Sequence, residues 1–337
     1  MDQRASARRI LLLAGVLLCV VAPSAAFADD CSPAAVGYRV MRIADRVVAV
    51  WYPTAAAAAE YRYGPNFSGF VAVGAPPSTV CGKPVPLVVF SHGDFGCGLQ
   101  SVALTEELAR HGYVVAAPDH ADAALCHTVA PPQAGLHPPQ PNVFKPETWS
   151  ETTFADRRQD IEAVLDGLLS NPEFENVIDA HNIGAAGHSL GGYTVVGMAG
   201  GWPNWTEPRI RAVLALSPYV MPFQVQATLG GVHVPLMYQG GTLDIGITPF
   251  LKGSKGAYSQ ANPPVYFVEL KNAGHLAWTN CGKAKTTASC LATRVNARLI
   301  DDYGIAFFDQ YLKRMPQRIL DRADPELADY QFRLPNQ

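Results

Sequence analysis

The sequence predicts an α/β fold with a mostly parallel central sheet, and three observations support that prediction. Short, continuously apolar runs alternate with segments whose apolar residues recur at helical spacing. The length of 337 residues, with 48% hydrophobic and 16% charged residues, is enough to bury one large core. We find no internal repeat and no linker between two cores, so we expect one domain over residues 29–337.

The first 28 residues have the pattern of a secretory signal peptide. Three arginines precede an apolar run over residues 10–22, and the small-residue pattern Ala26-Phe27-Ala28 follows. Cleavage after Ala28 would make the protein secreted or periplasmic. The apolar run is shorter than the roughly 20 residues of a membrane helix, and no later stretch approaches that length, so we expect no stable membrane insertion.

The charge and cysteine content argue against nucleic-acid binding and metal binding and in favour of disulfides. The formal net charge of −3, with no Lys/Arg cluster beyond the leader, argues against nucleic acid. Removal of residues 1–28 leaves an even number of cysteines, which in an exported chain favours disulfides over free thiols. The sequence contains no C-x-x-C or H-x-x-x-H spacing that would indicate a metal site. Six cysteines allow 15 pairings, among which the sequence alone does not select; closure of short loops favours Cys281–Cys290 and Cys97–Cys126, which leaves Cys31 with Cys81.

The expected strands follow in chain order. Two alternating segments at 38–43 and 47–52, joined by a short polar link, predict an antiparallel hairpin. After a Gly/Pro-rich stretch that ends at Pro84, the pattern changes to apolar runs that suit strands buried on both faces. These runs cover residues 86–90, 113–117, 183–187, 212–216, 235–238 and 265–270.

Helical spacing of apolar residues predicts helices near 154–169 and 295–307, which would cover both faces of the sheet. We interpret Arg157, Arg158 and Asp160 as a solvated face of the first of these helices. A Pro-rich insert at about 120–150 has no clear period. The insert follows a strand at the carboxyl edge of the sheet, where ligands bind in open α/β folds. It is therefore either a wall or lid over the site or a loop on the surface without a functional role.

The strongest chemical signal is Gly187-His188-Ser189-Leu190-Gly191-Gly192, between an expected strand and an expected helix. A G-x-S-x-G turn of this kind needs small flanking residues, because it is too tight for side chains. The turn raises Ser189 and places it at a helix start, where free N–H groups favour developing negative charge. The sequence therefore predicts Ser189 as a nucleophile.

A serine nucleophile needs a base and a group that orients the base, and both candidates follow downstream. Asp244 comes after the run 235–238, and His275 comes after the run 265–270. The carboxyl ends of parallel strands share one edge of the sheet, so these side chains can meet. His275 would take the serine proton, and Asp244 would hold the tautomer of His275.

An oxyanion hole needs two N–H donors. The backbone N–H of Leu190 is one candidate, and the loop after the run 86–90 offers the N–H of Asp94 as the second. A carboxylate near an oxyanion would repel it, so the side chain of Asp94 must point away, or Phe95 supplies the donor instead.

The segments LVVFSHG, GYVVAAPDH, GHSLGG, GGTLD and NAGH resemble the α/β-hydrolase superfamily over residues 36 to 315. More narrowly, they resemble its dienelactone-hydrolase-like and platelet-activating-factor-acetylhydrolase-like branch, near bacterial cutinases and polyester hydrolases. The resemblance implies an α/β-hydrolase fold, with Ser189, Asp244 and His275 as the triad and the amides of Asp94 and Leu190 as the oxyanion hole. Dienelactone hydrolase itself has a cysteine at the nucleophile position, so its reaction is not implied.

The predicted function is a secreted serine hydrolase that cleaves carboxylic esters through an acyl-enzyme without a cofactor. The expected partner is a small-molecule, lipid or polyester ester, and a monomer suffices. Phe95 and Trp278 are candidates for the substrate pocket, although core packing is the alternative for a tryptophan. An acyltransferase with the same triad, or a non-catalytic binding protein of this fold, are the alternative functions.

Overall fold

The computed structural model describes residues 33, 35–64, 67–124, 141–281 and 286–335. The predicted signal peptide, Cys31, Cys126 and residues 125–140 of the insert lie outside the described residues. The chain divides into the units Met1–Cys31 and Ser32–Gln337, and every described residue belongs to the second. No helix within the described ranges is both long enough and apolar enough to cross a membrane.

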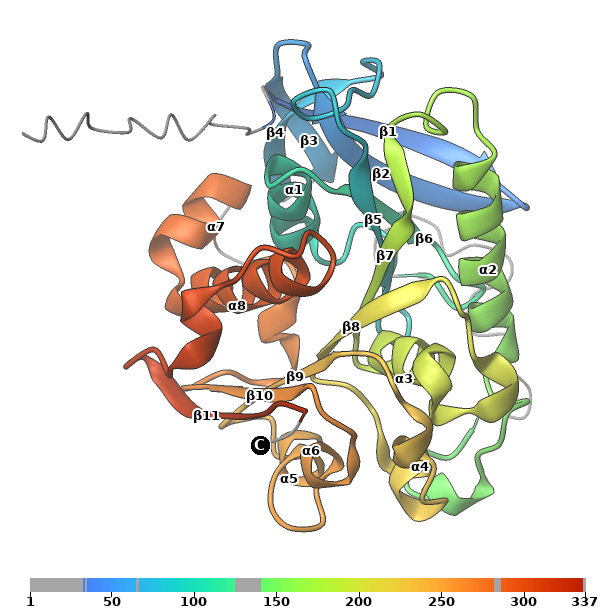
Figure 1. Cartoon of the computed structure of the whole chain (residues 1–337), viewed down its shortest axis with the longest axis vertical. Coiled ribbons are helices and arrows are strands. Elements are labelled where there is room, and N and C mark those ends of the chain that lie inside the picture. The colour runs from blue at the N-terminus through green and yellow to red at the C-terminus, as the bar shows by residue number, and fades with distance from the viewer. Residues whose placement is uncertain (1–32, 34, 65–66, 125–140, 282–285, 336–337) are drawn as a thin grey trace, which may run out of the picture. The chain divides into compact units, whose positions relative to one another are not determined.

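The second unit is built on an eleven-stranded sheet with the order β11-β10-β9-β8-β7-β5-β6-β2-β1-β4-β3 (Figure 1). The pairs from β6 through β5, β7, β8 and β9 to β10 are parallel, whereas β2 pairs antiparallel with both β1 and β6. The strands are β1 (Ala35–Ile43), β2 (Arg46–Thr54), β3 (Ala59–Gly64), β4 (Phe67–Val73), β5 (Val85–Ser91), β6 (Val114–Pro118), β7 (Ile178–His188), β8 (Ile210–Leu216), β9 (Leu236–Gly241), β10 (Val265–Leu270) and β11 (Leu327–Arg333).

Central strand β5 shows why these runs are continuously apolar. Its side chains alternate between faces, so Leu87 and Val89 enter one hydrophobic cluster while Val88 and Phe90 enter the other. Every residue of β5 is buried. Both faces are therefore covered, as a parallel sheet requires.

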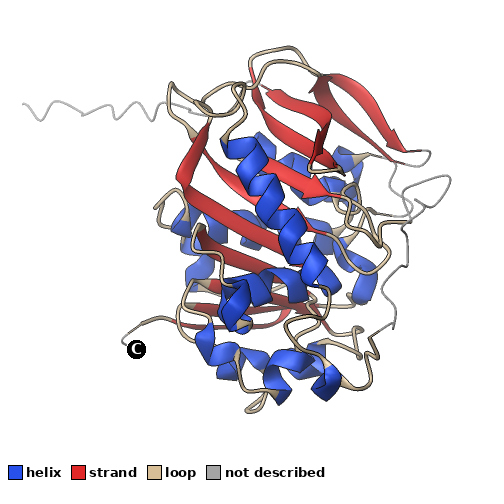
Figure 2. Cartoon of the chain, turned by 90° about the vertical axis from the view of Figure 1, so that its right-hand side faces the viewer, coloured by secondary structure: helices blue, strands red, loops and turns tan. Residues whose placement is uncertain are grey.

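Helices cover the two faces. Helices α1, α7 and α8 lie on one side, and α2 and α3 lie on the other, where Figure 2 shows helices crossing in front of the strands. The helices are α1 (Val102–Arg110), α2 (Ala155–Leu169), α3 (Leu190–Val196), α4 (Met221–Val225), α5 (Thr248–Leu251), α6 (Ala257–Gln260), α7 (Thr287–Thr293) and α8 (Val295–Tyr311). Short 3-10 turns lie at Pro146–Thr148, Pro203–Trp205, Leu229–Gly231, His275–Trp278 and Arg318–Asp321, and a π-turn at Gly197–Gly201.

The predicted fold class is confirmed, including the N-terminal antiparallel hairpin and the mostly parallel centre. Three strands were not expected. β3 and β4 lie in the stretch that we interpreted as Gly/Pro-rich connection, and β11 forms the far edge. β3 and β11 carry exposed or half-buried polar residues and lack the continuous apolar run of the central strands. β4 is mostly buried, but Ser68 and Gly69 interrupt its apolar residues.

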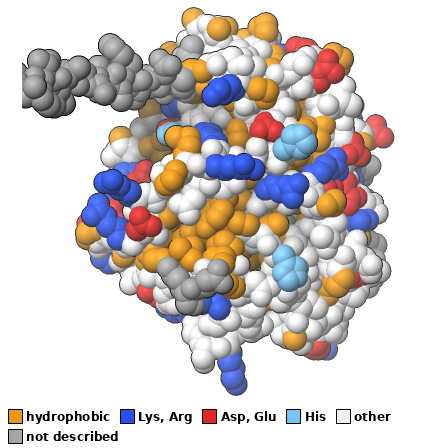
Figure 3. All heavy atoms as spheres, viewed as in Figure 1, with side chains coloured by type: hydrophobic (Ala, Val, Ile, Leu, Met, Phe, Trp, Pro, Cys, Tyr) orange, Lys and Arg blue, Asp and Glu red, His pale blue; other side chains and the backbone are white. Residues whose placement is uncertain are grey.

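The far edge of the sheet carries a hydrophobic surface. In Figure 3 orange side chains form a continuous area between α8 and β11, and half-buried hydrophobic residues there include Tyr311, Ile319, Tyr330 and Phe332. Tyr266 of β10 stacks on Phe332 with ring centroids 6.0 Å apart. The edge strand therefore extends the core beneath α8 toward the surface.

One predicted disulfide lies within the described residues. Cys281 and Cys290 are bonded, which joins the segment after β10 to α7. The other two predicted pairs, Cys97–Cys126 and Cys31–Cys81, each include a cysteine outside the described residues and stay predictions.

Candidate active site

Ser189 lies in a tight turn between β7 and α3. Its backbone has φ 55°, the left-handed region that is costly for a residue with a side chain. The turn also excludes side chains at its glycines. A Cβ on Gly191 would lie 1.9 Å from the carbonyl oxygen of Ser91, and one on Gly187 would lie 2.3 Å from the carbonyl oxygen of Gly191. These contacts explain the small residues on either side of Ser189.

The structure brings Ser189, His275 and Asp244 together at the carboxyl ends of β7, β10 and β9. His275 Nε2 lies 2.9 Å from Ser189 Oγ, and His275 Nδ1 lies 3.0 Å from Asp244 Oδ2. Asp244 is 4% exposed, whereas Ser189 lines an open cavity. A hydroxyl, an imidazole and a buried carboxylate in this order can move a proton away from the hydroxyl.

Ser217 is a fourth polar residue at this point, and sequence reasoning missed it. It directly follows β8, is fully buried, and donates a hydrogen bond to Asp244 Oδ2. Its Oγ also lies 2.9 Å from His275 Nδ1. The sequence signal that could have identified Ser217 is its position, one residue beyond the carboxyl end of the central strand β8.

The two expected oxyanion donors lie next to Ser189. Leu190 begins α3, and Asp94 lies in the loop after β5; both line the same cavity as Ser189. The N–H of Phe95 donates to Asp122 Oδ2 at 3.3 Å, on the buried side of the loop. Phe95 is therefore not placed to serve as the alternative donor.

Ser189 and His275 open into a cavity of about 1000 Å³ with largely apolar walls. Trp149, Phe154 and Tyr219 form one wall, and their rings pack together, with Trp149 and Tyr219 centroids 4.8 Å apart. Phe144 and Phe250 stand at the exposed rim. The arrangement can hold an uncharged, apolar group beside Ser189.

The described part of the insert is a wall of this cavity. Tyr219 donates to the carbonyl oxygen of Val143 at 2.6 Å, and Gln226 donates to that of Trp149 at 2.6 Å. Tyr193 donates to the carbonyl oxygen of Thr153 at 3.0 Å. These bonds tie residues 143–153 to the body of the unit.

Neither residue predicted to form the substrate pocket is among those that line the cavity within the described ranges. Trp278 is 3% exposed and donates to Gln239 Oε1 at 3.0 Å, so its role is packing. Phe95 is 38% exposed outside the cavity. The assignment of Phe95 and Trp278 to the substrate pocket stays a prediction, and proximity in sequence to His275 and Asp94 does not fix the direction of a side chain.

Hydrogen bonds of His188 connect the turn at Ser189 to the loop after β5 and to the turn that carries His275. Gln100 accepts from the N–H of Gly93 at 3.0 Å, so its amide nitrogen donates to His188 Nδ1 at 2.9 Å. His188 Nε2 then donates to the carbonyl oxygen of His275 at 2.8 Å. Burial, together with the nearby His275, lowers the pKa of His188 to about 3, which keeps the ring neutral.

A buried ionic cluster underlies the loop after β5, which corrects our interpretation of Arg157 and Asp160 as a solvated face. The side chain of Arg157 is fully buried and pairs with Asp122 at 2.6 Å. Asp160 accepts from Arg46 at 2.6 Å and contacts His120 Nδ1 at 2.8 Å. Arg157 precedes the buried Ile161 by one helical turn, so the spacing placed it on the apolar face.

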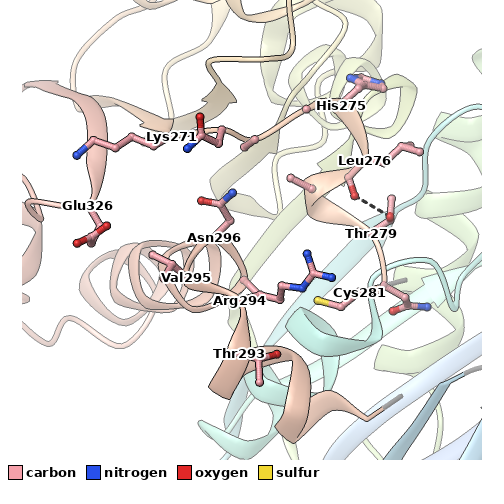
Figure 4. A pocket seen from close by; sticks show the side chains of 16 residues that line it. Lys271, His275, Leu276, Thr279, Cys281, Thr293, Arg294, Val295, Asn296 and Glu326 are labelled. Atoms are coloured by element: carbon pink, nitrogen blue, oxygen red, sulfur yellow. Dashed lines mark hydrogen bonds between the residues drawn. The ribbon is translucent and has the colours of Figure 1, made fainter. Parts of the chain in front are cut away.

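A second cavity, of about 750 Å³, lies beside the turn that carries His275 (Figure 4). Its lining is more polar and includes Arg294, Asn296 and Glu326. The imidazole of His275 points away from Arg294 and Asn296 in Figure 4. The reacting side of His275 therefore faces the first cavity. Among the described residues, no cluster of three or more His, Cys, Asp or Glu side chains could hold a metal ion.

Comparison with solved structures identifies the fold. A ferulic acid esterase from Streptomyces cinnamoneus superimposes with a TM-score of 0.63 at 22% identity, over 88% of this chain and 95% of that one. The chain has the α/β-hydrolase fold. The family model "Platelet-activating factor acetylhydrolase, isoform II" matches residues 70–160 of this chain, which confirms the predicted resemblance over that segment. No curated protein matches the chain significantly.

Proposed function

We propose that this α/β-hydrolase is a serine carboxylic-ester hydrolase that works through an acyl-enzyme. The observation that carries the proposal is the continuous contact from Ser189 Oγ through His275 to Asp244, with steps of 2.9 and 3.0 Å. A buried carboxylate, an imidazole and a cavity-lining hydroxyl are the parts that nucleophilic acyl transfer needs.

The reaction follows from these positions. Ser189 Oγ attacks the ester carbonyl as His275 Nε2 takes its proton, and the N–H groups of Leu190 and Asp94 stabilise the oxyanion. His275 returns the proton to the leaving alcohol. A water molecule, activated by the same imidazole, then attacks the acyl-enzyme, and the acid leaves.

The cavity supports an uncharged ester with an apolar acyl group as substrate. Trp149, Phe154 and Tyr219 offer ring faces and edges beside Ser189, and Asp94 is the one acidic residue among the described residues of the lining. One structural neighbour is a ferulic acid esterase, and the matching family model describes an acetylhydrolase, which is consistent with ester chemistry.

We further propose that the protein is exported after removal of residues 1–28. The Cys281–Cys290 disulfide supports an oxidising compartment. Mass spectrometry of the protein recovered from culture medium or periplasm tests this, because the exported form should begin at Asp29.

Labelling by a fluorophosphonate and turnover of p-nitrophenyl acetate together test the enzymatic proposal. The wild type should be labelled on the peptide that contains Ser189, and Ser189→Ala should lose labelling together with at least about 10⁴-fold in kcat. Ser217→Ala is the matched control, because Ser217 also touches His275 yet is fully buried, and it should remain labelled. An unlabelled wild type, or a labelled Ser189→Ala, contradicts the proposal. Product analysis with added alcohol separates hydrolysis from acyl transfer.

A further inference from the structure

Arg157 of α2 is fully buried beneath the loop that follows β5 and contacts its backbone directly. Arg157 Nη1 donates to the carbonyl oxygen of His92 at 2.7 Å, and Nη2 donates to that of Gly93 at 3.1 Å. A buried guanidinium is costly unless it is paired and hydrogen bonded, and its planar fork suits two acceptors at once. One side chain thus holds two consecutive carbonyl groups of this loop.

The geometry of the peptide unit links Arg157 to Asp94. The carbonyl of Gly93 and the N–H of Asp94 belong to one planar trans peptide, so they point in opposite directions. Arg157 Nη2, His92 Nδ1 at 2.7 Å and the N–H of Gly96 at 3.0 Å all donate to the Gly93 oxygen and hold it on the buried side. The N–H of Asp94 is thereby turned toward the cavity that Asp94 and Ser189 line.

Asp122 fixes the other end of the same turn. Its Oδ2 accepts from Arg157 Nη2 at 2.6 Å and from the N–H of Phe95 at 3.3 Å. Burial alone would raise the pKa of Asp122, but the positive charge of Arg157 holds that pKa well below its usual value. The Arg157–Asp122 pair therefore stays ionised and restrains the backbone on both sides of Asp94.

We propose that Arg157 positions the oxyanion hole by holding the Gly93 carbonyl, so that the N–H of Asp94 faces the ester carbonyl oxygen at Ser189. The inference rests on the proposed function. Arg157 itself is a positioning residue, because its side chain is buried and acts through the backbone of the loop.

Arg157→Lys tests this inference, since an ammonium keeps the charge near Asp122 but cannot hold both carbonyl groups in a fork. We expect kcat for p-nitrophenyl acetate to fall about 10²-fold, with KM within threefold. Affinity for an aryl trifluoromethyl ketone should fall by the same factor, because its adduct with Ser189 carries an oxyanion. Arg158→Met is the matched control on the same helix, where a half-buried Arg158 pairs with Glu162, and its kcat should stay within twofold.

Each kcat is calculated from the concentration of active sites, which is measured by reaction with fluorophosphonate to completion. An unfolded fraction of the variant therefore does not lower the measured kcat. Arg157→Met, judged in the same way, is the second variant. A kcat within twofold of wild type in Arg157→Lys overturns the inference, and so does a loss of kcat without a parallel loss of ketone affinity. An unlabelled wild type would instead defeat the proposed function.

Discussion

Ser217 Oγ lies 2.9 Å from His275 Nδ1, on the side of the ring that faces Asp244. The Ser217 hydroxyl has one proton, which it donates to Asp244 Oδ2. Its oxygen is then an acceptor toward the imidazole. The N–H of His275 is thus shared by the carboxylate and the hydroxyl, so both residues orient the ring.

Ser217→Ala should lower kcat about threefold to tenfold, because the variant removes one hydrogen bond to Asp244 and one acceptor for His275. Steady-state kinetics with p-nitrophenyl acetate measure this loss, and KM should change little. Ser217→Gly is a useful companion, because Ser217 has φ 43° and glycine adopts that conformation without strain. Wild-type kcat in both variants would show that Ser217 does not orient His275.

The principal site residues could be predicted from sequence because each follows a recognisable strand. Ser189, Asp244 and His275 come just beyond apolar runs, and the carboxyl ends of parallel strands meet at one edge. Ser217 follows a strand in the same way, but serine after a strand is also an ordinary turn residue, so its chemistry became evident only with its partners in place.

Buried charge and cavity lining could not be predicted in the same way. A charged residue on an apolar helix face, such as Arg157, needs a buried partner. That partner is Asp122, which is distant from Arg157 in the sequence and lies in the loop after β6. Trp278 follows His275 by three residues, yet its indole is turned into the core toward Gln239. Side-chain direction depends on tertiary packing, and the sequence pattern does not contain it.

Stability should rise with pH between about pH 3 and 6.5 because of His188. Its folded pKa is about 3, and its unfolded pKa is about 6.5. In that window the unfolded chain binds a proton that the folded protein excludes, so acid favours unfolding. The contribution of His188 is complete above the unfolded pKa, and it is lost as pH falls through the window at about 1.4 kcal/mol per pH unit.

Urea unfolding at pH 4.5, 5.5 and 7 measures this dependence. His188→Gln should reduce the slope of the unfolding free energy by about 1.4 kcal/mol per pH unit between pH 4.5 and 5.5. The remaining slope includes His92, whose pKa burial and the neighbouring Arg157 also lower. His181→Gln removes an exposed histidine and should leave the slope unchanged. Equal slopes in wild type and His188→Gln would contradict the assignment.

Gly191→Ala should prevent formation of the turn at Ser189. The new methyl group would lie 1.9 Å from the carbonyl oxygen of Ser91 and 2.7 Å from that of His92, and neither backbone atom can move freely. We expect a loss of about 3 kcal/mol or more in unfolding free energy, together with loss of fluorophosphonate labelling. Gly230→Ala is the matched control, because a Cβ there meets nothing within 4 Å. Labelling of Gly191→Ala at the wild-type rate would contradict this prediction.

Tyr219→Phe should change acyl selectivity while leaving the chemistry intact. Burial, with the charge of Glu147 nearby, raises the pKa of Tyr219 to about 12, so its hydroxyl remains a donor to the carbonyl oxygen of Val143. Removing that bond, worth about 1 kcal/mol, loosens the wall of the cavity that holds the acyl group in the proposed function. The ratio of kcat/KM for p-nitrophenyl hexanoate to that for the acetate should change about threefold to tenfold, with kcat for the acetate within twofold.

Tyr330→Phe removes the same kind of bond, a 2.7 Å contact from the tyrosine hydroxyl to the carbonyl oxygen of Leu320, at the far edge of the sheet. Its selectivity ratio should equal that of wild type. A Tyr219→Phe ratio equal to that of Tyr330→Phe would mean that the wall is held by the packing of Trp149 and its neighbours, without need of the hydrogen bond. A shift in Tyr219→Phe alone would mean that the segment containing Val143 limits the length of the acyl group, because the two variants lose equivalent bonds and differ only in what those bonds hold.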